Sequence, residues 1–178
     1  MGAVVHEVTL PDVDLLGGIG RFVMMAELAS IWGSKVTEAD VAPDVYAGID
    51  NGSRIEATEY IAAQRARNAL SREFRKVWDQ VDLLLTPTTP TPAPLIGATQ
   101  LEIGGVTEEI RVATTRFCRP FNVLGWPALS MPCGSTPQGL PIGVQLVGPP
   151  HGEESIFAAA YALETVKPYR IAEKPVGQ

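Results

Sequence analysis

The chain has 178 residues, with 14 Lys and Arg against 20 Asp and Glu, a net charge of −6, and 19% charged against 46% hydrophobic residues. Its length predicts one domain of about 150 residues or slightly more, and its negative charge argues against nucleic-acid binding, which needs clustered basic residues. The two histidines and two cysteines lack metal-ligand spacing, so we expect no metal or cofactor. The sequence has no apolar run near about 18 residues and no signal peptide. We therefore expect a cytoplasmic protein that does not span a membrane.

The first third of the chain is predicted to hold one strand and one helix. Apolar residues alternate over residues 4–10, which predicts a strand. A helix over 22–32 follows from apolar residues that share one face. The glycines at 17–20 lack the third glycine of a dinucleotide loop, because Val23 stands there, and we interpret them as a flexible entry to the helix. Residues 33–54 are rich in turn residues.

The middle of the chain combines a long helix with a stiff polar segment. Apolar residues at spacings of three and four predict a helix over 60–81, and residues 83–85 read as a short buried strand. Threonine and proline then alternate over 86–94. Prolines cannot donate to a sheet, so this segment leaves it as an extended stretch that displays hydroxyls. It is either a linker or part of a site at a strand end.

The second half is rich in proline and glycine and predicts two hairpins and a helix. Gly104-Gly105 is typical of a tight hairpin turn. A second hairpin pairs residues 128–133 with 141–147, and a helix follows over 153–165. Gln145 lies among small and apolar residues, where it either satisfies buried backbone groups or faces a pocket. The pattern predicts an α/β fold with a loosely held tail over 167–178.

No catalytic nucleophile is recognisable from the residues alone. Ser130 lacks the glycine-flanked turn of a hydrolase elbow. Cys133 has no positively charged neighbour in sequence to stabilise a thiolate. A triad of Ser130, His151 and an aspartate would depend on geometry that the sequence does not contain. The sequence therefore predicts no catalytic residue.

Two long blocks carry a family resemblance. They are Pro-Phe-Asn-Val-Leu-Gly-Trp-Pro-Ala-Leu-Ser-Met-Pro-Cys-Gly at 120–134 and Gly-Leu-Pro-Ile-Gly-Val-Gln-Leu-Val-Gly at 139–148. In their order and spacing they resemble the carboxy-terminal region of amidase signature enzymes, as do residues 82–93, the helix before them and residues 2–11. The resemblance implies a partial amidase signature fold, a mixed sheet flanked by helices, with 1–178 as a single region.

Catalysis in that family is carried by a Ser–Ser–Lys triad, and its nucleophilic serine lies in a Gly/Ser-rich segment whose backbone amides form an oxyanion hole. This sequence contains no such segment, and its four lysines, at positions 35, 76, 167 and 174, lack the family's context. We therefore expect a carboxy-terminal portion of an amidase that lacks the amino-terminal catalytic part and is inactive alone.

The resemblance also implies site-supporting residues and a substrate, a small-molecule amide in the full-length family. The expected pocket-facing residues are Thr86, Thr88, Asn122 and Gln145. Their alternative roles are turn hydroxyls, a loop-capping amide and a buried, satisfied amide. Gly152 occupies the place where tRNA amidotransferase subunits usually carry an acid before the final helix, which favours the general amidase branch.

Three functional hypotheses follow. The chain is an amidase-family C–N hydrolase polypeptide without its triad, or a subunit of a split enzyme whose amino-terminal partner carries the lysine and both serines. Alternatively, it is a non-catalytic remnant that binds a small molecule or a protein.

Overall fold

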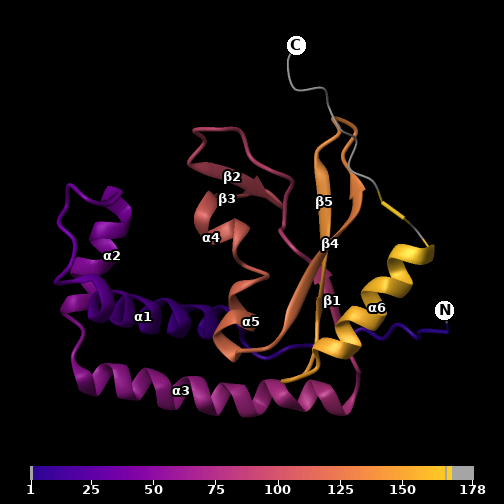
Figure 1. Cartoon of the computed structure of the whole chain (residues 1–178), viewed down its shortest axis with the longest axis horizontal. Helices are drawn as coiled ribbons and strands as arrows, with labels where there is room; N and C mark the ends of the chain where they lie inside the picture. The colour runs from indigo at the N-terminus through magenta and orange to yellow at the C-terminus, as the bar shows by residue number, and fades with distance from the viewer. Residues whose placement is uncertain (1, 167, 170–178) are drawn as a thin grey trace. The chain divides into compact units, whose positions relative to one another are not determined.

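The computed structural model describes residues 2–166, 168 and 169. The tail expected over 167–178 therefore lies almost entirely outside the described residues. The chain forms two compact units, one made of residues 9–76 and the other of the remaining residues. Figure 1 shows the elements of each unit in chain order.

Three helices form the unit of residues 9–76. They are α1 (Val13–Trp32), α2 (Pro43–Ser53) and α3 (Ala57–Arg75), and α1 contacts both of the others. Asp12 begins α1, because its carboxylate accepts a hydrogen bond of 2.8 Å from the backbone N–H of Leu15. A reciprocal capping box between Glu56 and Glu59 begins α3.

Two expectations for this unit are corrected. The glycines at 17–20 lie inside α1, which begins at Val13 and not at residue 22, because the Asp12 cap sets the start. The segment 33–54 contains α2, which starts with Pro43 at its first position. Glycine is required at Gly52, since a Cβ there would collide with the carbonyl oxygen of Met25 on α1.

Helix α1 is also long and apolar enough to cross a membrane by length and composition. Over 18 residues its mean hydropathy is 1.3, and 11% of that window is buried. The expectation that no stretch reaches this length is therefore wrong for α1. One such helix is weak evidence for a membrane span, because core helices of soluble proteins and signal sequences have the same properties.

The strand expected over residues 4–10 is absent. Residues 2–10 have no regular secondary structure, and Val4 and Val5 are 76% and 88% exposed. A strand is stable only when it pairs with another strand, and none of the described strands pairs with this segment. The alternation of residue types was therefore not sufficient to predict a strand here.

The other unit contains two antiparallel sheets. The larger one has the order β1-β5-β4, formed by β1 (Leu84–Pro87), β5 (Pro141–Val147) and β4 (Ala128–Ser135). The smaller one is the hairpin of β2 (Gln100–Ile103) and β3 (Val106–Glu109). Both expected hairpins are confirmed. The short 3-10 helix η1 (Lys76–Asp79) precedes the sheet. The final helix expected over 153–165 is confirmed as α6 (Glu153–Val166), which contacts β4 and β5.

The two faces of the larger sheet differ in character. Residues directly opposite each other in antiparallel strands point to the same face. One face therefore carries the apolar row Leu85, Leu146 and Leu129, and the other carries the polar row Thr86, Gln145 and Ser130. The fold is α/β with small sheets flanked by helices, and every strand pairing among the described residues is antiparallel.

Candidate functional site

The polar face of the sheet brings together three of the four predicted site residues. Thr86 on β1 lies opposite Gln145 on β5, which lies opposite Ser130 on β4. Thr88 follows β1 directly and joins the same face. These four residues, Thr86, Thr88, Ser130 and Gln145, are called the hydroxyl–amide row below.

Gln145 is the buried centre of the row, with only 4% of its surface exposed. Its side-chain nitrogen donates hydrogen bonds to the hydroxyl of Thr86 at 3.0 Å and to the backbone carbonyl of Phe117 at 3.1 Å. Of its two expected roles, the structure shows satisfaction of a backbone group. A pocket-facing role stays a prediction.

Thr88 and Ser130 form the other half of the row. Their hydroxyl oxygens lie 2.7 Å apart, and the backbone N–H of Thr88 donates to the carbonyl oxygen of Gly143 at 3.0 Å, which continues the pairing of β1 with β5. The two hydroxyls meet beside Gly143, where a Cβ would lie 2.9 Å from the Thr88 hydroxyl oxygen and 3.4 Å from that of Ser130. Glycine at this position is therefore what allows the two side chains to meet.

The backbone carbonyl of Thr88 accepts a hydrogen bond from the Cys118 thiol at 3.3 Å. Burial raises the pKa of this thiol above its ordinary value. Cys118 is therefore held in its neutral form at neutral pH, as a weak donor and not as a nucleophile.

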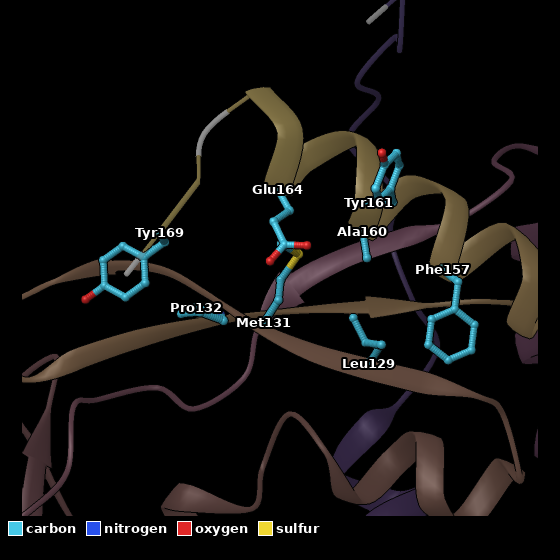
Figure 2. Close-up of a pocket in the computed structure, with 8 residues that line it drawn as sticks. All are labelled: Leu129, Met131, Pro132, Phe157, Ala160, Tyr161, Glu164 and Tyr169. Atoms are coloured by element: carbon cyan, nitrogen blue, oxygen red, sulfur yellow. The ribbon is translucent and has the colours of Figure 1, made fainter. Parts of the chain in front are cut away.

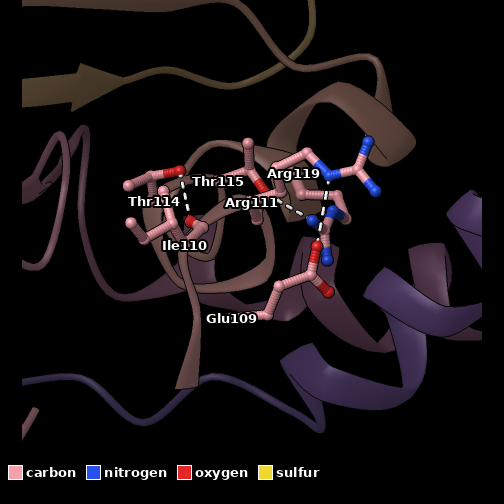
Figure 3. Close-up of polar contacts among 6 residues, drawn as sticks. All are labelled: Glu109, Ile110, Arg111, Thr114, Thr115 and Arg119. Atoms are coloured by element: carbon pink, nitrogen blue, oxygen red, sulfur yellow. Dashed lines mark hydrogen bonds and ion pairs between the residues drawn. The ribbon is translucent and has the colours of Figure 1, made fainter. Parts of the chain in front are cut away.

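A short helical turn contacts the polar face at Gln145. It links α4 (Ile110–Thr114) to α5 (Arg119–Leu124) and contributes the carbonyl of Phe117. Figure 3 shows the bonds that hold it: the hydroxyls of Thr114 and Thr115 each donate to a backbone carbonyl four residues earlier at 2.7 Å, and Arg119 donates to the Thr115 hydroxyl. The turn thus has a defined conformation above Gln145.

The fourth predicted residue, Asn122, is not part of the row. It lies on α5 with an exposed side chain, and its backbone N–H bonds to the carbonyl of Cys118 at 3.2 Å. Conversely, the sequence pattern suggests Ser130 only as a candidate nucleophile, and not as a member of this row. The register of the predicted hairpin, which sets Ser130 opposite Gln145, was the signal that could have identified it.

A cavity of about 430 Å³ lies between β4 and α6, and Figure 2 shows the residues around it. Because Leu129 and Met131 alternate with Ser130 along β4, this cavity lies on the opposite sheet face from the row. Its lining is mainly apolar and aromatic, with one carboxylate, and consists of Leu129, Met131, Pro132, Phe157, Ala160, Tyr161, Glu164 and Tyr169.

The described part of the chain offers binding groups and no activated nucleophile. The Ser130 hydroxyl pairs with another hydroxyl and not with a base, which a serine nucleophile requires. Among the described residues, no three His, Cys, Asp or Glu side chains are grouped so as to hold a metal ion. The row can therefore donate and accept hydrogen bonds, and nothing in its geometry activates it for bond cleavage.

Known proteins resemble this chain along most of its length. Residues 2–157 match the family model for amidases. One subunit of the glutamyl-tRNA(Gln) amidotransferase of Geotalea daltonii is 34% identical, and the alignment covers 92% of this chain and 38% of that protein. The fatty acid amide hydrolase of Arabidopsis thaliana is 37% identical over 119 residues, which are 67% of this chain and 19% of that protein.

Solved structures agree with these sequence matches. A crystal structure of an amidase superposes with a TM-score of 0.86 at 30% identity, covering 92% of this chain and 38% of that one. A 6-aminohexanoate cyclic dimer hydrolase superposes with a TM-score of 0.74 at 25% identity, covering 95% and 39%. The chain thus spans well under half the length of the relatives and structures it matches.

Proposed function

Because this chain belongs to the amidase family over residues 2–157, we propose that it supplies one wall of the substrate pocket of a C–N amide hydrolase. The observation that carries the proposal is the hydroxyl–amide row, which lies inside the matched region and on a sheet face. Its groups suit a small polar molecule such as an amide, whose carbonyl and N–H groups need hydrogen-bond partners.

The proposal extends to what this chain does not supply. The nucleophile of the family's Ser–Ser–Lys triad lies in a Gly/Ser-rich segment that this sequence does not contain. Ser130, which is on the row, bonds to Thr88, and no base among the described residues bonds to its hydroxyl. We therefore expect the 178-residue chain to be inactive by itself.

Ammonia release from simple primary amides tests this proposal. The purified chain alone should hydrolyse them no faster than buffer does. Mixed with the amino-terminal part of a related amidase, cut just before the region that this chain matches, it should restore turnover. The matched control is the same mixture with the triad lysine of the amino-terminal part replaced by alanine, which should abolish turnover.

Two results would contradict the proposal. Activity of the chain alone that survives repeated purification would show that it carries its own catalytic groups. A stable mixture that never hydrolyses an amide would show that this chain is no functional part of such an enzyme.

A second candidate, a component of a split enzyme, is favoured by exposed apolar residues. Leu15, Met24 and Ile31 on α1 and Phe157 on α6 are each more than half exposed. Apolar side chains exposed on each of the two units would be removed from water by a partner polypeptide. Co-purification of this chain from its source with a polypeptide that carries a Gly/Ser-rich segment would support this candidate. Purification of an active amide hydrolase that contains this chain and no other polypeptide would contradict it.

A further inference from the structure

We propose that the hydroxyl–amide row binds a second carboxamide on the acyl portion of the substrate, so that the enzyme prefers amides with polar acyl groups over fatty acyl amides. This inference rests on the proposed function, because it concerns the same site. It depends on how many hydrogen-bonding groups of the row remain unused.

Gln145 has one hydrogen-bonding atom left. Its two N–H hydrogens are taken by the Thr86 hydroxyl at 3.0 Å and the Phe117 carbonyl at 3.1 Å. A backbone carbonyl can only accept, so the atom that faces Phe117 must be the nitrogen, and the orientation of the amide follows. No donor among the described residues bonds to the carbonyl oxygen of Gln145, which therefore remains as an acceptor.

The hydroxyls of the row have protons to donate. Thr86 accepts from Gln145, so its own proton remains. In the pair of Thr88 and Ser130, whose oxygens lie 2.7 Å apart, one hydroxyl donates to the other and one proton is left over. The row thus offers one acceptor and two donors to a ligand.

A carboxamide matches this set, because its oxygen accepts two hydrogen bonds and its nitrogen donates two. A hydrocarbon chain on the row would instead remove these groups from water without replacing their bonds. Sites built to hydrogen-bond a substrate group reject analogues that lack it for this reason. The row therefore selects for a polar acyl portion.

The row is also open to a ligand at one end. Ser130 is exposed and Thr88 is half-buried, whereas Gln145 at the centre is buried. Gly143 places no side chain between the two hydroxyls. A carboxamide can thus approach from the Ser130 side.

NMR titration of the 15N-labelled chain tests the proposal without requiring catalysis. The two probes are malonamide and dimethyl malonate, in which methyl esters without N–H groups replace both carboxamides, because the isolated chain can bind either carboxamide of a probe. Malonamide should bind more tightly and shift the side-chain amide signals of Gln145. Ser130→Ala should weaken malonamide binding about three- to tenfold, the value of one hydrogen bond, and so reduce the preference of the chain for malonamide over dimethyl malonate.

Thr91→Val is the matched control. Thr91 belongs to the same Thr/Pro segment, and its buried hydroxyl has no hydrogen-bond partner among the described residues. Removing it should leave binding of both probes unchanged. Thr88→Val is the second test variant; it should reproduce the effect of Ser130→Ala, and it replaces that variant if Ser130→Ala does not fold.

Three outcomes would overturn the proposal: equal affinity for the two probes, no shift of the Gln145 signals, or equal weakening by Thr91→Val and Ser130→Ala. An unfolded wild-type spectrum would contradict the arrangement on which the row depends. In the reconstituted complex, Ser130→Ala should lower kcat/KM for malonamide several-fold more than kcat/KM for butyramide, whose single amide is the scissile one. A complex without hydrolysis would refute the proposed function, while the titration still decides whether the row selects malonamide.

Discussion

Gly143 decides how two hydroxyls meet on the polar face. A Cβ at this position would lie 2.9 Å from the hydroxyl oxygen and 3.2 Å from the Cβ of Thr88. Gly143→Ala should therefore displace Thr88, break its bond to Ser130 and lower the free energy of unfolding by about 1–3 kcal/mol. Urea denaturation followed by circular dichroism measures this change.

The matched control is Gly134→Ala on β4, where a Cβ would meet no atom within 4 Å. Alanine should be tolerated there, because glycine weakens a strand interior and alanine restricts the unfolded chain. Equal destabilisation by the two substitutions would mean that the contact with Thr88 is not what requires glycine at position 143.

Helix α1 illustrates stability at the scale of an element. The Asp12 carboxylate satisfies the N–H of Leu15, one of the unpaired donors in the first turn. Asp12→Ala should destabilise the helical unit by about 1 kcal/mol, measured as the loss of the α-helical signal in urea. Asp12→Asn keeps an acceptor oxygen and should retain most of the stability; a loss as large as that of Asp12→Ala would contradict capping by this side chain.

The elements that were predicted well from the sequence have both a regular pattern of apolar residues and turn or stop residues at an end. The hairpin of β4 and β5 has alternating faces and a turn with proline and glycine, and α6 has an apolar stripe and a proline stop. The missed helices α2, α4 and α5 are 11, 5 and 6 residues long. Such lengths allow few repeats of the helical period, so their start depends on a cap or on tertiary contacts.

The site was predictable only where a pattern pointed to it. Thr86, Thr88 and Gln145 stood out as polar residues at strand ends or among apolar neighbours. Their meeting with Ser130 depends on strand order, because β1 pairs with β5 across more than fifty intervening residues. Asn122 stood out in the resemblance to amidases, yet its side chain lies exposed on α5.

At the scale of the whole molecule, exposed apolar residues dominate the expected behaviour. Phe157 and Tyr161 on α6 are 61% and 74% exposed, and Leu15 and Met24 on α1 are also exposed. We expect the isolated chain to self-associate as its concentration rises, because association removes this apolar surface from water. Sedimentation velocity over a range of concentrations measures this.

Two comparisons make the prediction specific. Phe157→Ser combined with Tyr161→Ser should reduce self-association, whereas the exposed Thr58→Ser should not. Addition of the amino-terminal part of a related amidase should replace the self-associated species by a mixed complex. A chain that stays monomeric at every concentration, with or without that addition, would contradict the expectation.

The strand order β1-β5-β4 also has a consequence for synthesis on the ribosome. β1 emerges first, but its partner β5 follows only after the hairpin of β2 and β3, the turn that contacts Gln145 and strand β4. The hairpin of β4 and β5 can close locally, whereas pairing of β1 requires closure of a long loop, which is entropically costly and slow. Thr86 therefore reaches Gln145 late, and until then the nascent chain carries an unpaired strand whose Pro87, with the prolines that follow it, limits its pairing with other chains.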